Sequence, residues 1–111
     1  MLKLLLHVPD SSRFEAALKQ ARNFAIAMGD KPYQVRILVN FEGIIVLNDL
    51  SPYAPLLQEN FSLGIEVYFC ENAMKTFNVS MDKVPQQAKT VPAGIVVLVT
   101  WQDEGFRYVR A

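Results

Sequence analysis

Cys70 is the only cysteine in this chain of 111 residues, and it lies where a strand is expected to give way to a helix. Residues 65–69 alternate and are rich in β-branched and aromatic side chains, which favours a strand, while residues 71–75 are typical of a helix opening. Helix N-termini carry unpaired N–H groups and the positive end of the helix dipole, and both favour a thiolate. Because one cysteine cannot form an internal disulfide or a cysteine metal cluster, its remaining uses are a core side chain, a nucleophile or a carrier of sulfur.

His7 is the only histidine, and it lies near the end of residues 2–8, an apolar run consistent with a strand buried on both faces. At the ligand-binding edge of a parallel sheet it could serve as an acid, a base or a polar anchor. The alternative is a hydrogen-bonded histidine that only holds the following loop. One histidine and one cysteine do not support a metal site, and a Cys-His catalytic pair depends on whether His7 and Cys70 meet.

Four polar residues lie over the start of the next expected helix: Asp10, Ser11, Ser12 and Arg13. One interpretation is an anion pocket made by backbone N–H groups, the two hydroxyls and the guanidinium. The other is plain capping, with Ser12 as the N-cap and Glu15 completing a capping box. The segment has no glycine-rich loop to wrap phosphates, so nucleotide binding is not favoured.

Two further pairs of residues are candidates for a pocket around the thiol. Asn40 and Gly43 follow the second expected strand, and ordinary turn chemistry is the alternative explanation for them. Asn72 and Lys75 lie in the first turns after Cys70, where a solvated helix face is the alternative.

The composition limits the class of protein. A chain of this length forms one domain, here residues 1–111. Lysine plus arginine equal aspartate plus glutamate at 11 each, so the sequence gives no support to a nucleic-acid or anionic-membrane partner. The hydrophobic share of 51% predicts a homo-oligomer, with a dense monomer core as the alternative. The apolar start is too short for a signal peptide and no stretch approaches a membrane span, so we expect a cytoplasmic protein without a bound cofactor.

Helices and strands are expected to alternate along the chain. We expect a helix over residues 14–28 closed by Gly29, a strand over 33–40, and a helix that starts at Ser51 as its N-cap and runs to Gly64. Residues 44–47 are ambiguous between strand and helical turn. A short helix within residues 81–87 and a short strand at 88–91 follow.

The last segment has two interpretations. Residues 94–101 have the composition of a strand, and a loop at 102–105 would make residues 106–110 the returning strand of a hairpin. Alternatively, Pro92 begins a buried helix that Gly105 ends, and the final strand follows. Propensity alone favours the hairpin, whereas the alternation upstream favours the helix.

The chain resembles the DsrE/DsrF-like proteins over nearly its whole length, through the order and spacing of several short segments. The similar segments are residues 7–13 (HVPDSSR), 21–23 (ARN), 39–43, 67–74 (VYFCENAM), 91–94 (VPAG) and 102–108 (QDEGFRY).

The resemblance implies a three-layer α/β/α fold with a five-stranded, mainly parallel sheet, and it implies helix then strand for the last segment. It also implies a homo-oligomer, a trimer or a hexamer. If the strand before Asn40 neighbours the Cys70 strand, as the resemblance implies, the Asn40 loop forms one wall of the thiol pocket and Asn40 could donate a hydrogen bond to sulfur.

In the family's sulfur-relay members, a cysteine at this position accepts sulfane sulfur as a persulfide and passes it on. The resemblance therefore implies that Cys70 is the catalytic residue of a sulfurtransferase-like carrier with protein donors and acceptors. The residue after Cys70 departs from the family pattern, because Glu71 stands where the carriers have small residues. The alternative is a non-catalytic ligand-binding or regulatory oligomeric subunit. The residues expected to line the pocket are His7, Asp10, Ser11, Arg13, Asn40, Gly43, Asn72 and Lys75.

Overall fold

Strands and helices alternate along the chain in the computed structural model, which describes all 111 residues. The strands are β1 (Leu2–Val8), β2 (Tyr33–Val39), β3 (Glu66–Cys70), β4 (Lys89–Val91) and β5 (Arg107–Arg110). The α-helices are α1 (Phe14–Met28), α2 (Ala54–Ser62), α3 (Glu71–Thr76) and α4 (Gly94–Asp103). Short 3-10 helices occupy Ser11–Arg13, Phe41–Asn48, Ser51–Tyr53 and Met81–Lys83.

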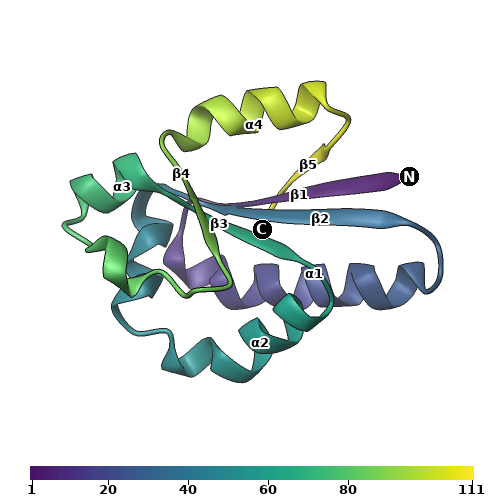
Figure 1. The fold of residues 1–111 in the computed structure, drawn as a ribbon, viewed down its shortest axis with the longest axis horizontal. Coiled ribbons are helices and arrows are strands. Elements are labelled where there is room, and N and C mark those ends of the chain that lie inside the picture. The colour runs from purple at the N-terminus through teal and green to yellow at the C-terminus, as the bar shows by residue number, and fades with distance from the viewer.

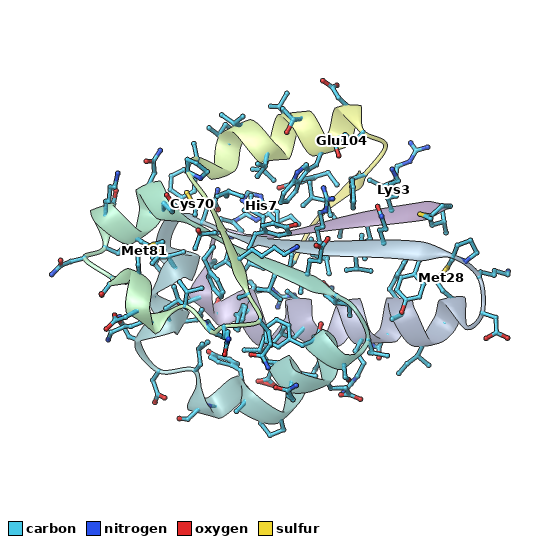
Figure 2. The ribbon with its side chains drawn as sticks, viewed as in Figure 1. Lys3, His7, Met28, Cys70, Met81 and Glu104 are labelled. Atoms are coloured by element: carbon cyan, nitrogen blue, oxygen red, sulfur yellow. The ribbon has the colours of Figure 1, made fainter.

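The five strands form one parallel sheet in the order β4-β3-β2-β1-β5. Helices α1 and α2 lie on one side of the sheet and α4 lies on the other, which gives three layers (Figure 1). The predicted fold class is therefore confirmed. Because all strands run the same way, their carboxyl ends share one edge, and that edge carries His7 of β1 and Cys70 of β3 (Figure 2).

The two sides of the sheet are packed unequally. The α1 and α2 side holds a cluster of 21 buried apolar residues, whereas the α4 side holds 6, among them Leu98 and Trp101 of α4. A single helix covers the second side, and it leaves Ile95, Val96 and Val99 exposed. The outer edge strand β5 is exposed along its length.

The last segment forms a helix and then a strand, so the hairpin that propensity favours is wrong. Leu98 and Trp101 bury themselves against the sheet, and this packing overrides the weak preference of β-branched residues for strands. Gly105 then takes a φ of 99°, a left-handed conformation that turns the chain into β5.

The predicted N-caps at Ser12 and Ser51 need correction, and so does the capping box of Ser12 with Glu15. Asp10, not Ser12, caps the first turn, because its carboxylate accepts hydrogen bonds from both the backbone N–H and the hydroxyl of Ser12. Asp49 does the same for Ser51. In both places a 3-10 turn precedes the α-helix, so the capping side chain lies further upstream than the sequence pattern predicted. The ambiguous residues 44–47 are helical, and only Met81–Lys83 of the segment 81–87 forms a turn of helix.

Candidate functional site

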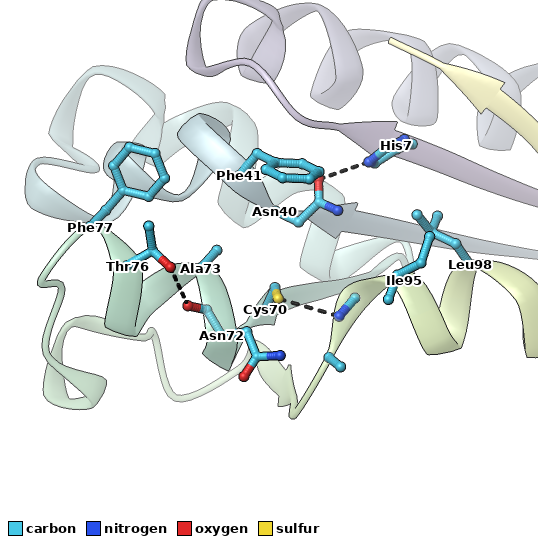
Figure 3. Close-up of a pocket in the computed structure, with 12 residues that line it drawn as sticks. His7, Asn40, Phe41, Cys70, Asn72, Ala73, Thr76, Phe77, Ile95 and Leu98 are labelled. Carbon is cyan, nitrogen blue, oxygen red and sulfur yellow. Dashed lines mark hydrogen bonds between the residues drawn. The ribbon is translucent and has the colours of Figure 1, made fainter.

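A pocket of about 510 Å³ opens at the carboxyl edge of the sheet, between α3, α4 and the 3-10 helix that follows β2. Its volume lies within the range of pockets that hold small molecules. The residues that line it are His7, Asn40, Phe41, Cys70, Asn72, Ala73, Thr76, Phe77, Ala93, Gly94, Ile95 and Leu98 (Figure 3).

Cys70 is the last residue of β3 and the N-cap of α3. Its side chain is buried, with 5% of the residue exposed, and its Sγ accepts a hydrogen bond of 3.3 Å from the backbone N–H of Gly94. Gly94 is the first residue of α4, so the positive end of a second helix also meets the sulfur. A negative charge on this sulfur would be stabilised by a donor that is already in place.

Gly94 lies against Asn40 and Leu38, at distances where an added Cβ would make ordinary contacts. A Cβ at this position would lie 3.4 Å from Cβ and Nδ2 of Asn40 and from Cδ2 of Leu38. The N–H of Asn72 donates to the carbonyl of Pro92, which ties the start of α3 to the segment that leads into α4. These contacts hold the two helix starts on either side of the thiol.

His7 is buried and both of its ring nitrogens are hydrogen-bonded, Nδ1 to the Tyr108 hydroxyl at 2.6 Å and Nε2 to Oδ1 of Asn40 at 2.8 Å. Because an amide oxygen only accepts, the neutral ring must carry its proton on Nε2, and the Tyr108 hydroxyl then donates to Nδ1. Burial lowers the pKa of His7; the Asn40 bond works against this and the nearby charge of Arg110 adds to it. His7 is therefore neutral at pH 7, and it fixes which way the Asn40 amide faces.

Asn40 is 5% exposed and uses only its oxygen within the protein. Its Nδ2 points away from His7 (Figure 3) and donates no hydrogen bond to another protein atom, while lining the pocket. The predicted bond from Asn40 to the sulfur is absent, because Gly94 supplies the donor to Sγ. The amide group instead presents a free donor to the pocket interior.

Of the residues expected around the thiol, the pocket brings His7, Asn40 and Asn72 together with Cys70. The other five lie outside it: Asp10, Ser11, Arg13, Gly43 and Lys75.

Three of the five outlying residues, Asp10, Ser11 and Gly43, make contacts elsewhere, and Arg13 is exposed. Ser11 donates from its N–H and its hydroxyl to the two carboxylate oxygens of Glu42, both at 2.7 Å. The N–H of Gly43 donates to the carbonyl of Pro9. Together with the Asp10 turn, these bonds hold the loop after β1 against the loop after β2, outside the pocket lining. Lys75 is exposed on α3.

Several lining residues escaped the sequence reasoning. Phe41 follows Asn40 and has a positive φ of 46°, unusual for a bulky side chain, yet 67% of it is exposed. Phe77 lies at the end of α3. Gly94 belongs to a segment that carried the family resemblance, but nothing in the sequence placed its N–H on the sulfur. Tyr108 does not line the pocket, but it bonds to His7 from the far end of the chain and was not among the expected site residues.

No charged side chain lines the pocket. Glu71, next to the thiol, accepts a hydrogen bond of 2.7 Å from the Thr90 hydroxyl and does not reach the pocket. No three His, Cys, Asp or Glu side chains gather in a way that could hold a metal ion. None of the helices is both long enough and apolar enough to cross a lipid bilayer.

Fold and site together define a small three-layer α/β protein with a buried thiol at the carboxyl edge of its parallel sheet. A family model described as the DsrE/DsrF-like family matches residues 4–111, and the chain belongs to this family. No curated protein matches the sequence at a significant level.

Solved structures share the fold. A protein of unknown function from Methanobacterium thermoautotrophicum, MTH1491, superposes with a TM-score of 0.86 at 21% identity, with 100% of both chains covered. A conserved protein of unknown function from Bacteroides thetaiotaomicron, BT1422, superposes with a TM-score of 0.75 at 18% identity, covering 98% of this chain and 94% of its own.

Proposed function

We propose that this protein carries sulfane sulfur as a persulfide on Cys70 and passes it to an acceptor thiol. The observation that carries the proposal is the position of Sγ, which lies in a pocket of ligand size and receives the N–H of Gly94 at the start of α4. That donor can bond to the negative sulfur of a thiolate, which is the nucleophile in sulfur exchange.

The two steps balance without an oxidant or a reductant. The Cys70 thiolate attacks the outer sulfur of a donor persulfide, R–S–SH; the S–S bond of the donor breaks, RS⁻ leaves, and Cys70 holds S–SH. An acceptor thiolate then attacks this outer sulfur, the S–S bond on Cys70 breaks, and the Cys70 thiolate is regenerated. Nδ2 of Asn40 is the nearby free donor that could bind the outer sulfur, and His7 keeps it turned toward the pocket.

We also propose that the chain acts as a cytoplasmic homo-oligomer, a trimer or hexamer, with sulfur donor and acceptor proteins as partners. The exposed Ile95, Val96 and Val99 on α4 support a contact between copies, because a second apolar surface would remove them from water. Zero net charge supports neither a nucleic-acid nor a membrane partner.

A second candidate is a non-catalytic ligand-binding or regulatory subunit. The burial of Cys70 and the apolar lining of the pocket favour it, because both suit a site that holds a molecule without reacting with it.

The intact mass of the purified, reduced protein after incubation with a persulfidated cysteine desulfurase separates the two functions. Sulfur carriage predicts a gain of one sulfur atom that is absent from Cys70→Ser and is discharged by an acceptor thiol. No gain, together with slow alkylation of the native thiol, would contradict carriage and support the binding subunit.

A further inference from the structure

We propose that the pocket over Cys70 selects an uncharged small molecule with an apolar body and one hydrogen-bond acceptor. If the proposed function holds, this molecule is a small sulfur donor or acceptor that uses the same thiol as the protein partners. The selection itself is a property of the pocket walls, and it can be tested whether or not Cys70 carries sulfur.

The lining of the pocket is uncharged. None of its residues carries a charge, and Glu71, next to Cys70 in the chain, is bonded to Thr90 instead. The helix starts of α3 and α4 meet at Sγ, where the N–H of Gly94 is already in use, so a carboxylate or an ammonium group entering the pocket would lose hydration without gaining an ion partner. A thiol compound that carries several charges is therefore a poor fit.

Most polar groups of the lining already have partners. Both nitrogens of His7 are bonded, the Thr76 hydroxyl donates to the Asn72 carbonyl, and the N–H of Gly94 donates to Sγ. The amide nitrogen of Asn40 donates to no protein atom and stays accessible from the pocket, although the residue as a whole is only 5% exposed. A ligand atom that accepts this hydrogen bond would displace water from the donor.

The mouth of the pocket is lined by exposed apolar side chains. Phe41 is 67% exposed, and its backbone has a positive φ, which is strained for a bulky residue. Packing within this chain compensates for neither the exposure nor the strain. Phe77 and Ile95 are also exposed lining residues from two other elements (Figure 3). Three apolar side chains from three elements offer a surface for the apolar body of a ligand.

The binding test uses the Cys70→Ser protein, which cannot carry sulfur. N-Benzylacetamide is uncharged, with an apolar body and an amide acceptor, and 4-(acetamidomethyl)benzoate is its anionic counterpart. In ¹⁵N-resolved NMR titrations we expect the neutral probe to shift the Gly94 backbone amide and the Asn40 side-chain amide, with an affinity at least about tenfold above that of the anion. Equal binding of the two probes, or no binding of either, would overturn the proposal even if wild-type Cys70 loads sulfur.

Three variants locate the selection in the pocket walls. Phe41→Ala and Phe77→Ala should each weaken N-benzylacetamide binding several-fold. Ile26→Ala, at an exposed apolar residue of α1 far from the lining, is the matched control and should leave binding unchanged.

A charge introduced into the lining provides the converse test. Asn72→Lys places a cation on the exposed side of the pocket and should raise the affinity for the benzoate probe relative to the neutral one. If the ratio of the two affinities does not move in Asn72→Lys, the uncharged lining is not what selects the ligand.

Discussion

Replacement of Gly43 by alanine tests whether this glycine serves packing rather than ligand binding. A Cβ at residue 43 would lie 2.4 Å from the carbonyl oxygen of Val8 and 3.2 Å from Cγ1 of Val39. Both valines are fully buried and pair with each other across β1 and β2, so neither can move alone. The 3-10 helix that contains Gly43 must shift instead.

The size of the shift sets the expected loss of stability. The new Cβ must retreat by about 1 Å, from 2.4 Å to an ordinary contact distance of 3.4 Å. The movement strains the bond from Gly43 N–H to the Pro9 carbonyl and the bond from Asn40 N–H to the Val8 carbonyl. Overpacking of a buried site costs about 1–3 kcal/mol and a weakened hydrogen bond about 1 kcal/mol, so we expect unfolding to become easier by about 2–4 kcal/mol.

Urea denaturation measures this loss, and Gly64→Ala is the control. Gly64 has a φ of +78° but nothing within 4 Å of its missing Cβ, so alanine there meets only backbone strain of about 1–2 kcal/mol. Gly43→Ala should also speed alkylation of Cys70, because the wall that carries Asn40 and Phe41 moves with it; Gly64→Ala should not. A Gly43→Ala protein within about 0.5 kcal/mol of wild type would refute the contact argument.

Three further substitutions test other contacts. In His7→Gln, the unfolding free energy should fall less between pH 7.5 and 5.5 than it does in wild type. Burial lowers the folded-state pKa of His7, so the unfolded chain binds the proton first as the pH falls through about 6.5. Proton binding to the unfolded chain lowers the stability of wild type, and His7→Gln lacks this loss. Equal slopes in denaturation series at the two pH values would exclude His7 as the cause. Tyr108→Phe removes the hydroxyl that donates to His7 and should cost about 1 kcal/mol in a urea titration, and an unchanged midpoint would show that this bond contributes nothing. Asn60→Ala should cost about 1–3 kcal/mol, because the buried Nδ2 donates to the carbonyls of Leu18 and Leu56 and joins α2 to α1; thermal unfolding equal to wild type would contradict this role.

Local patterns in the sequence were sufficient to place Cys70 at the junction of a strand and a helix, because alternation and helix-opening residues act over a few positions. They failed for α4, whose β-branched residues favour a strand until Leu98 and Trp101 pack against the sheet. The alternation of strands and helices upstream favoured the correct element there, and the family resemblance implied it, whereas propensity did not.

The candidate site was only partly predictable for a similar reason. Parallel strands bring their carboxyl ends together, so His7, Asn40 and Cys70 could be expected at one edge. The donor to the sulfur, Gly94, and the exposed Phe41 depend on how the α4 start and the loop after β2 pack, which no local pattern encodes. The sequence predicted a pocket role for Asp10, Ser11 and Gly43 that the structure does not show. Polar residues and glycines near a strand end hold loops together as readily as they bind ligands, so their types alone could not separate the two roles.

The hydrogen bond between His7 and Tyr108 joins residues that are 101 positions apart in the chain. Strand β5 pairs directly with β1, so a growing polypeptide cannot orient the Asn40 amide through His7 until residue 108 has emerged and docked. Pairing over such a separation is slow compared with local helix formation. A nascent chain would therefore present Cys70 and its strand well before the surrounding donors are in order, and the thiol would lie in its finished pocket only after Gly94 and Tyr108 have docked.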